Sequence, residues 1–212
     1  MINNKKKVAV LGLGEHQLSG IKLLKKEFIV FGFDADPNAL SKNYVDIFYN
    51  IDFKKKELIY KICKKNKISK ILSFNAEASM KSVLWINDKL ENTKSTNKYI
   101  ILDKIKLRSH LKRNKFPTPK FLSLKTMHLA KNSNFPAVIK PSSGSGSKGV
   151  FYSKNIIQFK KLFQKNIIHY KGKNILFEEY IPGPEYAVEG WVDKSSLFKI
   201  GAISRKKRSK LP

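Results

Sequence analysis

The sequence predicts an α/β protein in which a parallel-sheet domain at residues 1–98 precedes an α+β domain at residues 101–212. The first observation behind this prediction is that short apolar runs alternate with segments of helical spacing as far as residue 90. Strands that alternate with helices form parallel sheets with helices on both faces. The second observation is the polar segment Glu91–Lys98, after which shorter strands and turns rich in glycine, serine and proline surround one amphipathic helix.

The elements of the first domain follow from the spacing of its apolar residues. Leu18, Ile21 and Leu24 recur at helical intervals, whereas the run FIVFGF has the β-branched and aromatic character of a strand. The predicted strands are Lys7–Leu13, Glu27–Phe33, Phe48–Ile51 and Ile68–Phe74, and the predicted helices are Gln17–Lys26, Lys54–Asn66 and Ser79–Leu90.

The second domain opens with a helix that Asp103 is expected to cap and that ends at Asn114, before the breaker Phe116-Pro-Thr-Pro119. Two antiparallel strands, Tyr186–Val192 and Leu197–Ser204, are expected to start a further sheet near the end of the sequence. Between these segments we predict strands at Phe121–Leu124, Ala137–Lys140, Val150–Tyr152 and Ile175–Glu178, and a helix at Ile156–Ile168.

The formal net charge of +27 does not by itself indicate a nucleic-acid-binding protein. Only four of the 43 basic residues are arginine, the residue best suited to bidentate recognition of phosphates and bases, and the lysines are spread along the whole chain. A solvated, lysine-rich surface explains this pattern and can attract anionic substrates. We expect no specific nucleic-acid partner and no membrane partner, and the oligomeric state stays open.

The cysteine and apolar content favour a cytoplasmic protein. The single cysteine, Cys63, excludes an internal disulfide framework, and its helical surroundings predict a buried thiol. No run reaches the roughly 18 apolar residues that a membrane span needs. His16, His110, His128 and His169 are scattered along the sequence, so we expect no metal site built from them.

The turn after the first strand carries an incomplete dinucleotide fingerprint. Gly12 and Gly14 occupy the first two glycine positions of G-x-G-x-x-G, but Gln17 occupies the third. Asp34 and Asp36, at the end of the second strand, are candidates for ribose binding. The pattern favours a Rossmann-like turn that holds no dinucleotide.

A stronger motif joins a lysine to a glycine- and serine-rich loop. Lys140 ends the apolar strand Ala137–Lys140, and the loop Pro141–Gly149 follows at once. An ammonium group at a strand end can contact a phosphate or a purine nitrogen, and backbone N–H groups of such a loop can close over phosphates. The spacing is not that of a P-loop, and a flexible solvent-exposed loop is the alternative.

A third motif combines acidic residues with a tight turn. The strand that contains Phe177 ends in Glu178 and Glu179, turns at Pro182-Gly183-Pro184 and resumes at Glu185. The backbone of such a bend can offer hydrogen bonds to an adenine edge, and Glu185 can accept hydrogen bonds from ribose hydroxyls. An exposed acidic turn explains the segment equally well when it is taken alone.

The three motifs in this order resemble those of the ATP-grasp superfamily of carboxylate–amine ligases, which includes carbamoyl-phosphate synthase, biotin carboxylase and D-alanine ligase. The resemblance covers nearly the whole chain. Residues 1–98 are similar to the Rossmann-like pre-ATP-grasp domain of those enzymes, and residues 101–212 to the first part of the ATP-grasp domain, with its second subdomain incomplete. The resemblance implies an ATP-binding site, small-molecule carboxylate and amine substrates, and a reaction through an acylphosphate.

The resemblance also assigns roles to individual residues. It places Lys104 and Lys140 on the phosphates, Lys140 also near adenine, and Glu185 on the ribose. It places the glycine-rich loop over the β- and γ-phosphates, and the hinge Glu178, Glu179 and Ile181 on adenine. The complete set of expected nucleotide contacts is Lys104, Lys140, Ser142, Ser143, Gly144, Ser145, Gly146, Ser147, Lys148, Gly149, Glu178, Glu179, Ile181 and Glu185.

One part of the family pattern does not occur in this sequence. The Glu and Glu-x-Asn residues that hold magnesium in the family have no counterpart after Ser204, and Arg205–Lys207 match its phosphate-facing basic residue only loosely. We therefore expect an N-terminal portion of a ligase, in which Mg²⁺ binds only together with the C-terminal half. No catalytic residue is assigned.

Three functional hypotheses remain at this point. The first is the ATP-binding portion of a ligase, the second is a non-catalytic nucleotide-binding or interaction module derived from one, and the third is a dinucleotide enzyme, which Gln17 disfavours. The segments Gly14–Gln17 and Asn75–Glu77 are further candidates for substrate contact, because ligands of α/β proteins gather at the carboxyl ends of parallel strands. For Asn75–Glu77, the start of a helix is the alternative.

Overall fold

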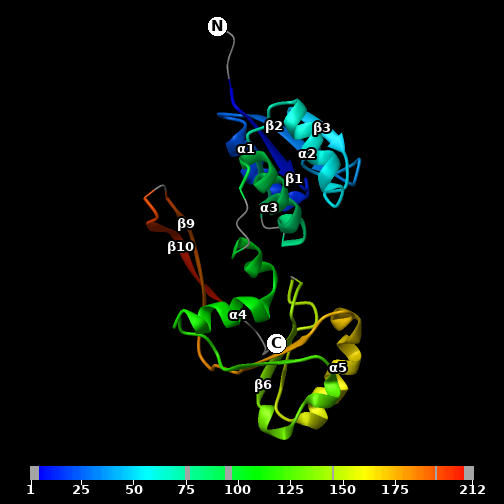
Figure 1. Ribbon diagram of the computed structural model, residues 1–212, viewed down its shortest axis with the longest axis vertical. Helices are drawn as coiled ribbons and strands as arrows, with labels where there is room; N and C mark the ends of the chain where they lie inside the picture. The colour runs from blue at the N-terminus through cyan, green and yellow to red at the C-terminus, as the bar shows by residue number, and fades with distance from the viewer. Residues whose placement is uncertain (1–4, 75–76, 94–96, 145, 194, 208–212) are drawn as a thin grey trace. The chain divides into compact units, whose positions relative to one another are not determined.

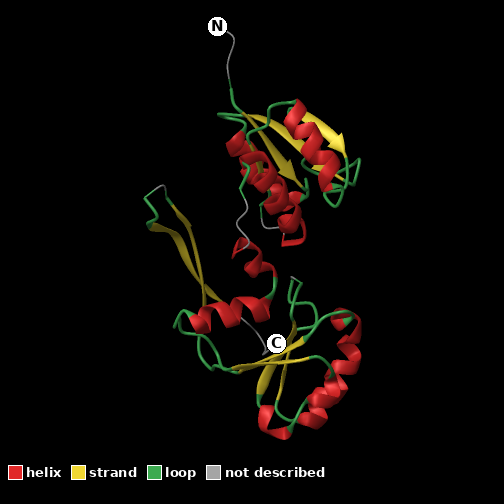
Figure 2. Ribbon diagram, viewed as in Figure 1, coloured by secondary structure: helices red, strands yellow, loops and turns green. Residues whose placement is uncertain are grey.

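The structure, a computed structural model, describes residues 5–74, 77–93, 97–144, 146–193 and 195–207 (Figures 1 and 2). It is a mixed α/β protein that contains one parallel sheet and two antiparallel ones. The sequence predicted the parallel sheet and the antiparallel pair of strands near its end. The chain divides into two compact units. The first unit contains Met1–His110 and Ser143–Gly146, and the second contains Leu111–Ser142 and Ser147–Pro212.

The first unit is built on a parallel sheet with the strand order β3-β2-β1-β4. The first strand pairs with two neighbours: Val8 lies opposite Val30 on one side and opposite Lys70 on the other. The four strands are β1 (Lys7–Leu11), β2 (Ile29–Asp34), β3 (Ile47–Asn50) and β4 (Lys70–Leu72). Each overlaps a predicted strand and is shorter at one or both ends, except that β2 includes Asp34 and β3 includes Ile47.

Helices cover both faces of this sheet, so successive residues of the central strands enter two different cores. Ala9 and Leu11 pack toward α2 (Lys56–Lys65) and α3 (Glu77–Glu91). Val8 and Val10 pack in a second cluster with Ile21 of α1 (Leu18–Leu24). This alternation explains why the strands read as continuous apolar runs, as expected of a sheet that is buried on both faces.

Cys63 is fully buried in the cluster beneath α2, which confirms the predicted buried thiol. Burial raises the pKa of Cys63 to about 12, because a thiolate would lose its hydration there. The cysteine therefore stays a neutral, apolar core side chain over the physiological pH range.

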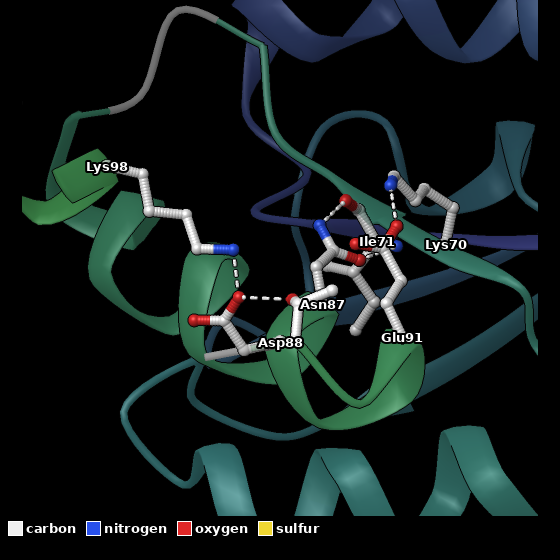
Figure 3. Close-up of polar contacts among 7 residues, drawn as sticks. Lys70, Ile71, Asn87, Asp88, Glu91 and Lys98 are labelled. Atoms are coloured by element: carbon white, nitrogen blue, oxygen red, sulfur yellow. Dashed lines mark hydrogen bonds and ion pairs between the residues drawn. The ribbon is translucent and has the colours of Figure 1, made fainter. Parts of the chain in front are cut away.

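Polar contacts fix α3 against the short edge strand β4 (Figure 3). The Asn87 side chain brackets the backbone of Ile71: its Oδ1 accepts from the Ile71 N–H at 2.9 Å, and its Nδ2 donates to the Ile71 carbonyl at 2.8 Å. Lys70 pairs with Glu91 at the end of α3, and Lys98 pairs with Asp88. Asn87 thus satisfies the backbone groups that the edge strand exposes there.

The second unit contains an antiparallel sheet with the order β5-β8-β6-β7. Its apolar face packs beneath α5 (Ile156–Asn166), where the ring centroids of Phe159 and Phe177 lie 5.1 Å apart. Asn155 caps α5 by accepting a hydrogen bond from the Gln158 N–H. The strands are β5 (Phe121–Leu124), β6 (Ala137–Pro141), β7 (Phe151–Ser153) and β8 (Ile175–Glu179).

The predicted hairpin is confirmed as β9 (Glu185–Val192) paired with β10 (Phe198–Lys206) in antiparallel register. Every described side chain of β10 is exposed, including Phe198 and Ile203. Hydrogen bonds from Ser195 and Leu197 to the Asp193 carboxylate hold the turn and lower the pKa of Asp193. The hairpin thus presents a row of apolar side chains to solvent.

The remaining helical segments connect these elements. Asp103 caps α4 (Lys104–Arg113), as predicted, by accepting hydrogen bonds from the N–H groups of Ile105 and Lys106. The predicted helix at Ile156–Ile168 ends earlier than expected and continues as a 3₁₀ turn. The six 3₁₀ turns of the described chain are η1 (Glu15–Gln17), η2 (Lys42–Tyr44), η3 (Asn97–Leu102), η4 (Met127–Leu129), η5 (Asn132–Asn134) and η6 (Ile167–Tyr170).

We predict that Asn87→Ala lowers the free energy of unfolding by about 1–3 kcal/mol, because it leaves two backbone groups of Ile71 without their partners. Urea unfolding followed by circular dichroism measures the change. The matched control is Asn43→Ala, whose side chain is exposed in η2. Equal stability of the two variants would contradict the anchoring role of Asn87.

Candidate functional site

Two charged residues of the predicted site meet on one face of the antiparallel sheet. Strands β6 and β8 are neighbours, with Val138 opposite Glu178 and Lys140 opposite Leu176. Because alternate residues of a strand point to opposite faces, Lys140 and Glu178 share the face that α5 does not cover. They form an ion pair in which the side chains are 17% and 6% exposed, respectively.

The burial of this pair has a chemical consequence. Removing a carboxylate and an ammonium group from water costs several kcal/mol per ion, and a pair of this kind recovers that cost only with good geometry and further hydrogen bonds. The Lys140 ammonium carries three N–H donors, more than one carboxylate oxygen accepts. Its pairing with Glu178 therefore fixes the ammonium in place and leaves it suited to bind an anionic or electron-rich ligand.

The glycine-rich loop Ser142–Gly149 follows Pro141, the last residue of β6, and leads toward β7. Ser142 is buried, and its N–H donates to the Asn174 carbonyl at 3.0 Å. Ser143 is half-buried, whereas Gly146, Ser147 and Lys148 are exposed, and Ser145 lies outside the described residues. The loop is thus fastened at its start, beside Lys140, and open to solvent in its middle.

The end of the loop requires a glycine. Gly149 has a φ of +76°, and a Cβ atom there would lie 2.7 Å from the Cβ of His169. The Tyr170 hydroxyl donates to the Gly149 carbonyl at 2.7 Å. Gly149 is therefore held against η6, so both ends of the loop are fixed.

Lys104 reaches the same loop from the first turn of α4. Its ammonium group donates to the Gly144 carbonyl at 2.6 Å. Lys104 and Gly144 both belong to the first unit, and the contact of Lys104 with the nucleotide phosphates stays a prediction. An ammonium group bonds a phosphate oxygen more strongly than a backbone carbonyl, so a phosphate could replace the Gly144 carbonyl as the partner of Lys104.

The residues of the acidic hinge, from the end of β8 to the start of β9, differ in their contacts and in their exposure. Glu179 is committed to the fold, because its N–H donates to the Lys120 carbonyl at 2.9 Å and its Oε1 accepts from the Lys120 N–H at 2.8 Å. Ile181 is 63% exposed in the turn. At the start of β9, Glu185 pairs with Lys206 of β10 at 2.8 Å, and both side chains are largely exposed.

The sequence motifs did not identify an aromatic pair on the same face. Tyr152 of β7 lies opposite Val138, which places it on the face that carries Lys140 and Glu178. Its ring centroid is 5.0 Å from that of Tyr180, which follows β8. The alternation of β7 would have placed Tyr152 on this face, but its pairing with β6 is not visible in the sequence.

The first unit gives its glycine turn a structural role. Gly12 has a φ of +82°, and its N–H donates to the Phe33 carbonyl. Gln17, in the place of the third fingerprint glycine, is 3% exposed, and its amide bonds both the N–H and the carbonyl of Phe74. Asp34 accepts from the Leu13 and Asp36 N–H groups. Gln17 and Asp34 therefore bind the loops together.

Three further observations concern expectations that the sequence analysis stated. Of the predicted substrate segment Asn75–Glu77, the first two residues lie outside the described chain, and Glu77 begins α3. Among the described residues, no group of three His, Cys, Asp or Glu side chains is arranged to hold a metal ion. No helix in the described ranges is long and apolar enough to cross a membrane.

Comparison with known proteins gives a family match for the second part of the chain. Residues 133–212 match the model of the ATP-grasp domain. No curated protein sequence matches the chain. The matched segment contains Lys140, the glycine-rich loop and the acidic hinge.

Solved structures share the fold over nearly the whole chain. L-amino acid ligase from Bacillus licheniformis is 20% identical, with a TM-score of 0.77 over 98% of this chain and 52% of that one. N5-carboxyaminoimidazole synthetase from Staphylococcus aureus complexed with ADP is 12% identical, with a TM-score of 0.77 over 98% and 57%.

A third structure is the biotin carboxylase domain of 2-oxoglutarate carboxylase from Hydrogenobacter thermophilus, in complex with MgADP, ADP and bicarbonate. It is 18% identical, with a TM-score of 0.64 over 85% of this chain and 45% of that one. The present chain therefore spans about half the length of these proteins. Residues 133–212 thus match the ATP-grasp domain model, and the chain shares its fold with these solved structures, in agreement with the resemblance that the motifs indicated.

Proposed function

We propose that this chain binds ATP on the face of the antiparallel sheet that carries Lys140 and Glu178. It would do so as the nucleotide-binding portion of an ATP-dependent carboxylate–amine ligase that works through an acylphosphate. The observation that carries the proposal is the buried Lys140–Glu178 ion pair beside the start of the glycine-rich loop. Buried, paired charges at the edge of a fixed loop are typical of a binding site rather than of a solvated surface.

The described geometry supports a division of roles within the proposed site. Lys140 would bind the α-phosphate and approach adenine, and the loop 142–149 would cover the β- and γ-phosphates with its N–H groups. Lys104, which the resemblance also places at the phosphates, would add a positive charge there. Glu178, Glu179 and Ile181 would contact adenine, and Glu185 would bind the ribose. The ADP complexes of similar folds support a nucleotide rather than another anion.

Two glutamate side chains already have partners in the structure, which limits the contacts that they could make with a nucleotide. The Glu179 carboxylate already bonds the Lys120 N–H, so its contribution to adenine would come through its backbone carbonyl. Glu185 would have to exchange its exposed pairing with Lys206 for ribose hydroxyls. Exposed ion pairs contribute only about 0–1 kcal/mol, so this exchange costs little. The aromatic surface of Tyr152 and Tyr180 would offer the adenine ring an apolar wall.

The proposed function also includes a division of the chain into two domains. We place the Rossmann-like pre-ATP-grasp domain at residues 1–98 and the ATP-grasp portion at residues 101–212. Mg²⁺ at such a site would be held by the nucleotide phosphates and one or two carboxylates; among the described residues, no group of three His, Cys, Asp or Glu side chains could hold a metal ion by itself. The nucleotide contacts that this chain contributes would come from its lysines, its loop and its hinge.

We predict that Lys140→Ala weakens ATP binding by about 1.5–3 kcal/mol, roughly 10- to 150-fold, the value of a charge-assisted hydrogen bond. Titration calorimetry on the folded variant measures the change. Lys154→Ala is the matched control, because Lys154 is exposed and lies after β7. The double variant Lys140→Met/Glu178→Gln removes the buried charge that the single change leaves unpaired. Unchanged affinity in both variants would remove Lys140 from the site.

We also predict that the 212-residue chain binds ATP in preference to NAD but does not turn it over with any carboxylate and amine pair. The reason is that the Glu and Glu-x-Asn residues to which the resemblance assigns magnesium have no counterpart after Ser204, since loss of such charge stabilisation costs several kcal/mol of activation free energy. The assay is magnesium-dependent ADP release with a panel of substrates. Sustained turnover would show that the catalytic groups lie elsewhere in the chain, and a preference for NAD would refute the nucleotide assignment.

A further inference from the structure

A cavity of about 520 Å³ lies in the second unit, where the end of α5, the turn η6 and the segment after β5 come together. Its volume falls within the range of about 300–1,000 Å³ that is typical of small-molecule sites. The proposed ATP site does not use it. Phe163 and Ile175, which line the cavity, belong to the core beneath α5, whereas Lys140 and Glu178 lie on the other face of the sheet.

The interior of the cavity is apolar. Phe163 and Ile175 are buried residues of its lining, and Met127, Ile167 and Ile168 line it as well. These two consecutive isoleucines are 59% and 71% exposed. Exposed apolar surface of this kind costs about 25 cal/mol per Å² relative to burial, so an apolar ligand that covers it would gain free energy.

Three lysines line the cavity. Lys125, Lys171 and Lys173 contribute to its lining, and no aspartate or glutamate does. Within the described chain, none of these three lysines takes part in an ion pair. Lysine side chains in the lining of a cavity that also contains apolar side chains favour an anion that carries an apolar body.

The wall of the cavity is already formed. Tyr170 is 5% exposed, its ring lies 4.6 Å from that of Phe163, and its hydroxyl donates to the Gly149 carbonyl. Burial raises the pKa of Tyr170, which keeps the hydroxyl protonated as a donor. A preformed wall reduces the entropy that a ligand must overcome on binding.

We propose that this cavity binds an amphipathic organic carboxylate. The apolar tail of the ligand would lie against Phe163, Ile167 and Ile168, and its carboxylate would bind Lys171 and Lys173. A bare anion would leave the apolar floor uncovered, and a neutral apolar molecule would leave the lysines without a counterion. The site is distinct from the proposed ATP site, because Lys140 and Glu178 lie on the opposite face of the sheet, although the Tyr170 hydroxyl of the cavity wall contacts Gly149 of the loop.

Decanoate is a suitable probe, since it combines a medium-length apolar tail with one carboxylate. Calorimetric titration of the 212-residue chain should show one decanoate per chain, bound at least about tenfold more tightly than acetate or 1-decanol. Acetate tests the charge alone, and 1-decanol tests the tail alone. Absence of decanoate binding, or equal binding of either control compound, would overturn the proposal.

Substitutions in the cavity locate the ligand. Ile168→Asp and Lys171→Gln, both at exposed positions, should each weaken decanoate binding about tenfold or more. The matched controls are Ile157→Asp, at a side chain that is 78% exposed on α5 outside the cavity, and Lys161→Gln on the same helix. An equal loss in the controls would show surface adsorption instead of a site, and unchanged binding in the cavity variants would also refute it.

Discussion

The structure of the candidate site depends on one interaction, the buried ion pair between Lys140 and Glu178. The two residues are separated in the sequence by a loop and a helix, and the antiparallel register of β6 and β8 brings them to one face. Neither charge would be stable at this degree of burial without the other, because removal of one partner from such a pair costs about 3–5 kcal/mol. The pair therefore fixes a lysine ammonium at the start of the glycine-rich loop.

The two faces of this sheet serve different purposes, and the alternation of residues along each strand separates them. Ile139 and Phe177 face α5 and build the core, whereas Lys140 and Glu178, one residue further along each strand, face the other way. A slip of one residue in the register would place charges in the core and phenylalanines at the site. The hydrophobic cluster beneath α5 thus determines where the charged pair lies. The position of the loop 142–149 depends on the cluster and on the pair, because the loop follows the strand that contributes to both.

Much of the fold could be predicted from the sequence, because apolar periodicity is a local property. The run at Phe121–Leu124 became β5 with the predicted bounds, and Asp103 caps α4 as its residue type indicated. Contacts between distant segments could not be predicted this way. In the sequence, Gln17 only occupies the place of the third glycine of the dinucleotide fingerprint, whereas in the structure its side chain bonds the backbone of Phe74.

The same limit applies to the candidate site. The motifs and their order predict nucleotide contacts for Lys104, Lys140 and Glu185, but they did not predict that these side chains contact Gly144, Glu178 and Lys206. Those partners depend on strand pairing and on loop closure, which no local pattern encodes. Tyr152 was missed for the same reason, since its place beside the charged pair follows from its register against Val138.

The most direct test of the central claim is hydrogen–deuterium exchange of the 212-residue chain with and without ATP. Binding at the charged face of the sheet predicts slower exchange in residues 140–149 and 178–185, because the nucleotide would order the exposed loop and the hinge. The turn at residues 12–17 should exchange as it does in the free protein. Protection confined to that turn, or no protection at the loop and hinge under saturating ATP, would contradict the account.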